Sequence, residues 1–113
     1  MENCLFCKIA AGDIPSKKAY EDEKILCFYD IAPQAPIHLL VIPKEHIASA
    51  NEVTEENAAI VSHIFAILPK IAAQVGLEGG YRIVSNCGPD ACQSVQHLHF
   101  HILGGKKLTE NMA

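Results

Sequence analysis

The sequence predicts an α+β domain that combines one long helix with several short strands. Apolar residues recur at helical spacing over residues 54–75, which indicates an amphipathic helix. Short apolar runs bounded by turn-forming residues at 25–29, 38–42 and 81–85 indicate strands. A further segment, 97–103, alternates histidine with apolar residues at the spacing of a strand. This mixture is typical of a sheet with helices packed against it.

Length and composition limit the classes of protein to consider. The 113 residues suffice for one core, and we expect a single domain over residues 1–113. The chain is 50% hydrophobic and 19% charged, which is a globular composition. Its formal net charge of −4 disfavours nucleic-acid binding. No apolar run approaches the ~20 residues of a membrane span and no basic leader is present, so we expect a cytoplasmic protein without a membrane partner.

The first half of the chain gives three local predictions. Residues 4–11 are predicted to form a short N-terminal helix that ends at Gly12. The strand at 25–29 is predicted to end at Asp30. The segment Ala-Pro-Gln-Ala-Pro at 32–36 cannot continue a helix or a strand ladder, so it is predicted to be a loop.

The central part of the chain predicts a buried strand and then the long helix. The strand at 38–42 is apolar on both faces, as in the middle of a sheet, and is closed by Pro43. Thr54 is the predicted N-cap of the helix, and Gly76 is its predicted stop. Pro69 lies inside the helix and should kink it. Beyond the strand at 81–85, a turn-rich loop leads into the histidines, as an anion-binding loop would lead into a catalytic strand.

Three histidines, His97, His99 and His101, would lie on one face of a strand. A lone histidine is commonly a core residue bonded to the backbone, but three at strict alternation point to a site. A neutral imidazole can act as a nucleophile toward phosphorus, and it needs a second group to hold its other nitrogen. His99 has a histidine on either side to serve in this way. Gln93 and Ser94, just before the segment, are placed to bind phosphoryl oxygens.

Cysteine usage suggests a metal site. Five cysteines are an odd number, and nothing signals export, so a disulfide framework is disfavoured. Cys4 and Cys7 form a Cys-x₂-Cys pair, a common half of a structural zinc site, and the six histidines offer further ligands. The alternative is two buried apolar cysteines. A catalytic zinc on the three alternating histidines is disfavoured, because one straight strand spreads them too far for tetrahedral geometry.

Other polar residues support narrower predictions. Asp30 could bind a ribose diol, or it could cap the loop that follows it. His38 is a polar residue in an apolar run, which suggests a site. His63 is expected to be a surface or boundary residue, and Cys27 is expected to lie in the core.

With these residues in view, the sequence resembles the histidine triad (HIT) family, and within it the Hint branch of nucleoside phosphoramidate and adenylate hydrolases. The family signature, His-φ-His-φ-His-φ-φ with φ an apolar residue, stands at 97–103. The resemblance spans nearly the whole chain in the family's order. The further matching segments are 28–38, 41–46, Asn86-x-Gly88, 93–95 and 103–105.

The resemblance implies a fold and an activity. The fold would be an antiparallel sheet of about five strands with the long helix and the short N-terminal helix, paired into a homodimer with a continuous sheet. The activity would be hydrolysis of P–N or acyl-phosphate bonds of purine nucleoside monophosphates through a nucleotidyl-histidine. The alternatives are a dinucleoside polyphosphate hydrolase, whose branch usually has Gln where this chain has Ser94 or His101, and a zinc-containing nucleotide-binding or regulatory protein.

The resemblance also implies roles for single residues. His99 would be the nucleophile, His101 would contact the phosphate, and His38 would support the nucleophile. Ser94 would bind the α-phosphate and assist the leaving group. The remaining nucleotide contacts would come from Asp30 and Ile31 at the nucleoside and from Asn86, Cys92 and Gln93 at the phosphate.

Bacterial-type members of the family add a structural zinc held by Cys-x₂-Cys and two histidines. The implied ligands here are Cys4, Cys7, His46 and His97. In that case His97 is a metal ligand and not a catalytic partner. One departure from the Hint pattern is that Ala91-Cys92 stands where Gly-Gly is usual. If the backbone there has a positive φ, the Cβ atom of Cys92 would cost free energy.

Overall fold

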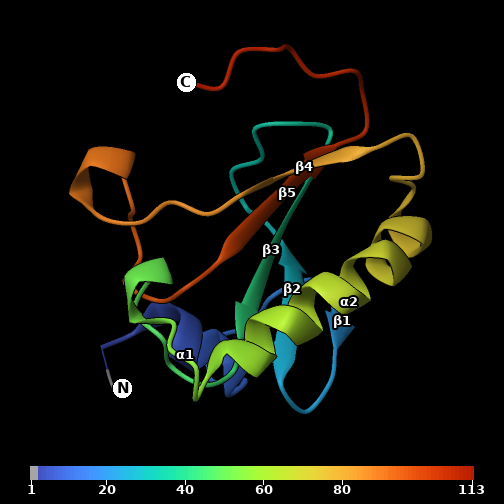
Figure 1. Cartoon of the computed structure of the whole chain (residues 1–113). Coiled ribbons are helices and arrows are strands. Elements are labelled where there is room, and N and C mark those ends of the chain that lie inside the picture. The colour runs from blue at the N-terminus through green and yellow to red at the C-terminus, as the bar shows by residue number, and fades with distance from the viewer. Residues whose placement is uncertain (1–2) are drawn as a thin grey trace.

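The computed structural model describes residues 3–113, and these form one antiparallel sheet with helices beside it (Figure 1). The strand order is β1-β2-β3-β5-β4, with every neighbouring pair antiparallel. The predicted α+β architecture with a five-stranded antiparallel sheet is therefore confirmed. The strands are β1 (Lys18–Glu21), β2 (Ile25–Tyr29), β3 (Ile37–Pro43), β4 (Tyr81–Val84) and β5 (Phe100–Gly104). The helices are α1 (Leu5–Ala10) and α2 (Ala58–Val75), with 3-10 turns at Ala50–Glu52 and Pro89–Ala91.

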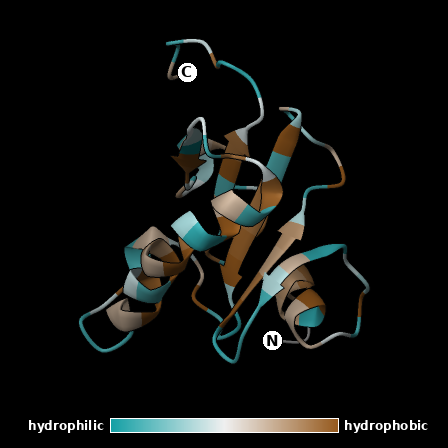
Figure 2. Ribbon diagram, turned by 90° about the vertical axis from the view of Figure 1, so that its right-hand side faces the viewer, coloured by the Kyte–Doolittle hydropathy of each residue, from teal (hydrophilic) through white to brown (hydrophobic). Residues whose placement is uncertain are grey.

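The sheet lies between the two helices and carries an apolar core on each face (Figure 2). Successive side chains of a strand point to opposite faces, so β2 and β3 serve both cores. The core on the α1 side consists of Phe6, Ile9, Leu26, Phe28, Leu40 and Ile42. The core on the α2 side includes Cys27 as predicted, and burial raises the pKa of its thiol to about 12.

α2 begins later than predicted. Asn57 occupies the N-cap position, and its Oδ1 accepts the N–H of Thr54 at 2.7 Å, so Thr54 belongs to a turn before the helix. The prediction of Thr54 as the N-cap was wrong because a side-chain bond closes this turn. The stop at Gly76 is confirmed, with φ +87° at that residue, and Pro69 lies within the helix.

By length and composition alone, α2 is apolar enough to cross a membrane. Its buried residues, however, pack onto the sheet as those of a core helix do. The side of α2 nearest the β1–β2 turn carries His63, whose Nε2 lies 2.7 Å from Oδ2 of Asp22. Burial opposes ionisation of Asp22, but hydrogen bonds from His63 and from the Lys24 and Ile25 amides hold the pKa of its carboxyl well below the ordinary range.

Two strands differ from the predictions. β1 was not predicted from the residue pattern, because this edge strand has charged residues at both ends and little apolar signal. β5 begins only at Phe100, so His97 and His99 lie before the strand. The chain leaves the ladder there because the N–H of Leu98 donates to the carbonyl of Ile47 at 2.6 Å.

The alternation of the histidine segment nevertheless holds. Leu98, Phe100 and Ile102 are buried in the core on the α2 side. His97 and His99 contact Phe6 of α1, on the other side of the sheet. All three histidines therefore belong to the face that α1 covers, as the period of two predicts.

Candidate active site and metal site

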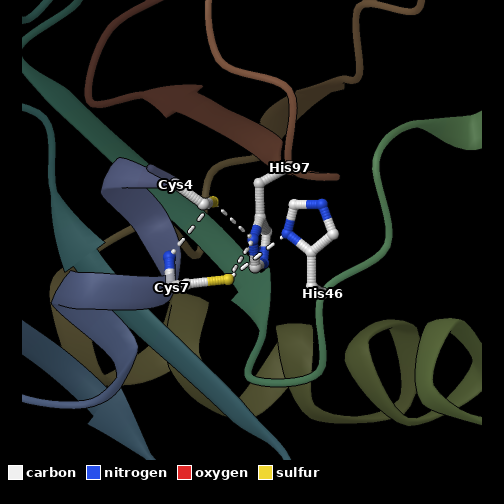
Figure 3. Close-up of side chains that lie close together, drawn as sticks. All are labelled: Cys4, Cys7, His46 and His97. Carbon is white, nitrogen blue, oxygen red and sulfur yellow. Dashed lines mark hydrogen bonds between the residues drawn. The ribbon is translucent and has the colours of Figure 1, made fainter. Parts of the chain in front are cut away.

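Four metal-ligating side chains from distant parts of the chain converge beside α1 (Figure 3). The Sγ atom of Cys7 lies 3.3 Å from Nδ1 of His46 and 3.5 Å from Nδ1 of His97, and Sγ of Cys4 lies 3.3 Å from the same His97 atom. A tetrahedral zinc with bonds of ~2.0–2.3 Å holds its ligand atoms ~3.3–3.8 Å apart. The four donors thus have the identity and spacing of a Cys₂His₂ zinc site.

Hydrogen bonding prepares His97 as a ligand. Its Nε2 lies 2.8 Å from the carbonyl oxygen of Pro43, so Nε2 carries the proton and Nδ1 presents a lone pair to the two sulfurs. Burial lowers the pKa of His97, which keeps the ring neutral. Burial, with Cys4 as a neighbour, raises the pKa of the Cys7 thiol, and a bound cation would offset that effect. The residues present therefore fit a structural zinc.

The backbone of the same residue orients the central histidine. The carbonyl oxygen of His97 accepts a hydrogen bond from Nδ1 of His99 at 2.7 Å. The proton of a neutral His99 therefore lies on Nδ1, and Nε2 keeps its lone pair. The ring of Phe6 packs edge-on against His99, with the ring centroids 5.1 Å apart. His99 is thus held in the geometry and tautomer of a nucleophile.

His38 and His101 form a second hydrogen-bonded pair across β3 and β5. The backbone N–H of Gln34 donates to Nδ1 of His38 at 3.0 Å, so the ring proton of His38 is on Nε2. That Nε2 lies 2.8 Å from Nδ1 of His101 and 3.4 Å from Oδ2 of Asp30. A neutral His101 that accepts at Nδ1 carries its own proton on Nε2. Its Nε2–H is then a hydrogen-bond donor.

Burial keeps this pair neutral near pH 7. It lowers the pKa of His38, and the charge of Asp30 only partly opposes the effect. It also lowers the pKa of His101, with further lowering by the neighbouring His99 and His38. The rings of His99 and His101 lie 5.1 Å apart between centroids. Both residues line one cavity, so the lone pair of His99 and the N–H of His101 belong to the same site.

A cavity of about 530 Å³ opens in front of these two histidines. Its walls come from α1, β2 and β3, and its volume is in the range of small-molecule sites. Asp30, Ile31 and Ser94 line it together with His99 and His101, so five predicted site residues meet there. Oδ1 of Asp30 also accepts the N–H of Ala32 at 2.8 Å, so this carboxylate closes its loop as well.

The loop before the histidine segment contributes less to the cavity than its sequence suggests. The amides of Cys92 and Gln93 donate to the carbonyls of Pro89 and Gly88. The Gln93 side chain is bound to backbone groups as well: its Nε2 donates to the carbonyls of Ala48 and Val95, and its Oε1 accepts the N–H of Gly88. Gln93 therefore holds the loop together.

Asn86 and Cys92, the other predicted phosphate contacts, lie on either side of this loop. Asn86 is half-buried just after β4, and Cys92 is exposed. Cys92 has φ +60° and ψ +41°, a left-handed conformation, so the strain anticipated from its Cβ atom is present.

Three contributors to the site were not predicted from the sequence. The first is Phe6, which lies between Cys4 and Cys7. An aromatic residue between two predicted metal ligands was the one feature of the sequence that could have pointed to it. The other two are backbone groups, the Gln34 amide and the Pro43 carbonyl, and the residue type at a position does not predict such contacts.

Comparisons with known proteins show which proteins this chain is similar to. The family model described as "Scavenger mRNA decapping enzyme C-term binding" matches residues 3–112. An uncharacterized HIT-like protein of Synechococcus elongatus is 50% identical over 107 residues, which are 95% of this chain and 94% of the relative. A 14 kDa zinc-binding protein of Zea mays is 45% identical over 106 residues, or 92% of this chain and 83% of the relative. The solved structure of a HIT family hydrolase from Clostridium thermocellum is 46% identical with a TM-score of 0.96, and the match covers 100% of this chain and 99% of that one.

Proposed function

The chain belongs to the histidine triad (HIT) family, and we propose that it hydrolyses P–N or acyl-phosphate bonds of purine nucleoside monophosphates. The observation that carries the proposal is the pairing of an unprotonated Nε2 on His99 with an N–H on His101 at one cavity. A structural homologue described as a HIT family hydrolase supports the hydrolase class.

In the proposed reaction, the lone pair of His99 Nε2 forms a bond to the α-phosphorus. The bond from phosphorus to the leaving nitrogen or acyl oxygen breaks, and its electron pair stays on that leaving atom. A leaving amine gains a proton from solvent on its nitrogen, while His101 stays neutral and its Nε2–H donates a hydrogen bond to the phosphoryl group; an acyl leaving group can depart as a carboxylate. Water then adds to phosphorus, the bond to His99 breaks, and the proton that this water loses returns to solvent.

The nucleotide would be bound by residues at the two ends of the cavity. We assign Asp30 to the ribose hydroxyls and Ile31 to the purine, because both line the cavity and Ile31 is exposed. The hydroxyl of Ser94 would contact the α-phosphate and the leaving atom. Asn86 and the loop around Cys92 and Gln93 are proposed to complete the phosphate site from outside the cavity.

The structural zinc is proposed to hold α1 against the segment that carries His97, through Cys4, Cys7, His46 and His97. Its chemistry would be structural, because the four protein donors complete a tetrahedral set. We further propose that the protein works in the cytoplasm, where its free cysteines stay reduced. Subcellular fractionation tests that location.

The decisive experiment is the substitution His99→Ala, assayed with adenosine 5′-phosphoramidate. Turnover should fall by at least about 10³-fold, because the substitution removes the lone pair that forms the covalent intermediate. Mass spectrometry of the wild-type protein quenched during turnover should find a nucleotidyl adduct on His99. A variant that keeps near-normal kcat would refute the mechanism.

Substrate comparison separates the proposed activity from its alternatives. A phosphoramidate hydrolase should act faster on an AMP amidate than on diadenosine triphosphate, and the reverse order would favour the polyphosphate branch. Tight AMP binding with turnover below ~1 s⁻¹ on every substrate would favour a zinc-containing binding protein.

A further inference from the structure

A cavity of about 680 Å³ opens beside the proposed zinc site. Cys4 and His46, two of the four metal-ligating residues, line it, so a small molecule in this cavity meets the cluster from one side. Within residues 3–113, neither Cys7 nor His97 lines the same cavity. A solute therefore reaches the sulfur of Cys4 before that of Cys7.

The two cysteines are also placed to react with each other (Figure 3). Their Sγ atoms belong to a cluster whose donor atoms all lie within 4.8 Å of one another. The backbone N–H of Cys7 donates to Sγ of Cys4 at 3.3 Å, so Cys4 is turned toward the first turn of α1, from which Cys7 projects. Rotation of the two side chains suffices to bring the sulfurs to the ~2 Å of a disulfide bond.

We propose that Cys4 and Cys7 form a modification site that a peroxide oxidises reversibly to a disulfide, and that this oxidation releases the zinc and loosens α1. Zinc-bound cysteines are thiolates, and the thiolate is the form that reacts with peroxides. The cavity gives the oxidant its access to Cys4, and Cys7 is the neighbour that completes the disulfide.

The oxidation balances as two displacements. The thiolate of Cys4 attacks one oxygen of the peroxide, the O–O bond breaks, and hydroxide leaves, which gives a sulfenic acid on Cys4. The thiolate of Cys7 then attacks the Cys4 sulfur, the S–O bond breaks, and a second hydroxide leaves. The two sulfurs lose two electrons in all and the peroxide gains them, while solvent protons convert both hydroxides to water. Neither sulfur keeps the negative charge with which it would hold a zinc ion.

Oxidation changes what holds the wall of the cavity of about 530 Å³, the nucleotide cavity. A disulfide joins Cys4 to Cys7 within one short segment, and the link through zinc to His46 and His97 is lost. Phe6, between the two cysteines, lines the nucleotide cavity and packs edge-on against His99. The disulfide should therefore free α1 to move away from the sheet and weaken nucleotide binding.

The test is a titration of the full-length, zinc-containing protein with hydrogen peroxide. Peptide mass spectrometry should find a disulfide between Cys4 and Cys7, and a colorimetric chelator should detect about one zinc ion released per disulfide. The Kd of AMP, measured by calorimetry, should rise about tenfold or more, because only molecules with α1 in place bind well. A dithiol reductant with added zinc should reverse all three changes.

Two variants identify the order of the steps. Cys7→Ser should stop the reaction at the sulfenic acid of Cys4, which dimedone traps as a stable adduct. Cys87→Ser is the matched control, because it removes a free cysteine outside the metal cluster, and it should form the disulfide and release zinc as the wild-type protein does. The peptide map of the wild-type protein decides the question by itself if Cys7→Ser does not fold.

Several results would overturn the proposal. One is oxidation of the exposed Cys92 with Cys4 and Cys7 left reduced. Others are a purified protein that holds no zinc, zinc release with sulfinic acids in place of the disulfide, and a disulfide that leaves the Kd of AMP unchanged. The AMP measurement rests on the proposed function, but the disulfide and the zinc release do not. A reduced protein that fails to bind AMP or to cleave any phosphoramidate would instead refute the proposed function.

Discussion

Single atoms decide the chemistry of the histidine segment. Residue 97 offers its Nδ1 to the two cysteines, while its carbonyl oxygen holds the ring of His99. His38 accepts a hydrogen bond from the Gln34 amide at Nδ1 and donates one from Nε2 to Nδ1 of His101. Of the three imidazoles that look alike in the sequence, His97 and His101 carry the ring proton on Nε2 and His99 carries it on Nδ1. Only His99 therefore has a lone pair on Nε2, the atom assigned to attack.

Residue types at the site could be predicted from the sequence, but their backbone partners could not. The alternation of His97, His99 and His101 correctly placed them on one face, because the side-chain period follows from local geometry. The bonds from the Gln34 amide and to the Pro43 carbonyl depend on how distant segments come together. Backbone groups occur at every residue and so leave no pattern in a sequence.

The left-handed residue in the phosphate loop leads to a prediction about stability. Cys92→Gly should be neutral or should raise the free energy of unfolding by up to about 1 kcal/mol, because removal of the Cβ strain outweighs the added chain entropy. Urea unfolding curves measure this difference. Cys92→Val is the control and should destabilise the protein, since a β-branched residue fits φ +60° poorly. A loss of more than about 1 kcal/mol in the glycine variant would contradict the account.

At the scale of elements, α1 connects the metal site to the nucleotide cavity. The helix and its N-cap supply two metal ligands, and its residues Leu5, Phe6 and Ile9 line the cavity of about 530 Å³. The helix is only six residues long, too short to be stable by itself. Its position therefore depends on the packing of Phe6 and Ile9 and on the proposed zinc that would join the two cysteines to His46 and His97.

Removal of the proposed zinc should loosen α1 and weaken nucleotide binding together. An ion present at a thousandfold above its Kd adds about 4 kcal/mol to the free energy of unfolding, and a chelator should remove that amount. AMP affinity should fall in the same samples, because α1 forms part of the cavity wall. Thermal unfolding and AMP titration by calorimetry, with and without chelator, measure both effects.

Cys87→Ser is the matched control, because it alters a free cysteine outside the metal cluster. It should leave both responses to the chelator unchanged, whereas Cys7→Ser should abolish them. An unchanged melting temperature and AMP affinity in chelator-treated wild-type protein would disprove the link between the metal and α1.

The elements themselves were predictable where the local pattern was strong. The short N-terminal helix and the stop of α2 at Gly76 follow from capping and spacing. The predicted start of α2 was wrong because the side chain of Asn57 accepts a hydrogen bond from the Thr54 amide. The preference of Thr for the N-cap position does not exclude such a turn before the helix. β1 was missed because its strand character comes from pairing with β2.

At the scale of the whole molecule, the sheet ends in β4, whose outer edge has no partner strand among residues 3–113. Ile83 of β4 is 37% exposed, an apolar residue left at the surface of an edge strand. We propose that two copies pair along β4 to give the homodimer with a continuous sheet. Such pairing would cover the edge and remove its apolar surface from water.

Ile83→Lys should convert the dimer into a monomer, because two positive charges would meet across the new ladder. Analytical ultracentrifugation at micromolar concentration measures the change in mass. Glu23→Lys makes the control, since it places a positive charge on the turn between β1 and β2, far along the sheet order from β4. A monomeric wild-type protein, or a dimer that persists in Ile83→Lys, would rule out this interface.

The bond from the Gln34 amide also determines where the chain can accept an ion. Asp30, His38 and His101 bring donor atoms within 4.8 Å of one another, and a carboxylate with two imidazoles is a set that binds divalent iron in other proteins. Nδ1 of His38 accepts a hydrogen bond from the Gln34 amide, and Nε2 carries the ring proton. This ring therefore has no free lone pair for a metal unless the hydrogen bond from Gln34 breaks. His97 also carries its proton on Nε2, but there the carbonyl of Pro43 accepts that proton's hydrogen bond, and Nδ1 meets no N–H and is free for coordination. Two backbone groups thus direct a metal toward the cysteines and away from the reacting histidines, and of the twenty amino acids only proline at position 34 would delete the N–H that protects them.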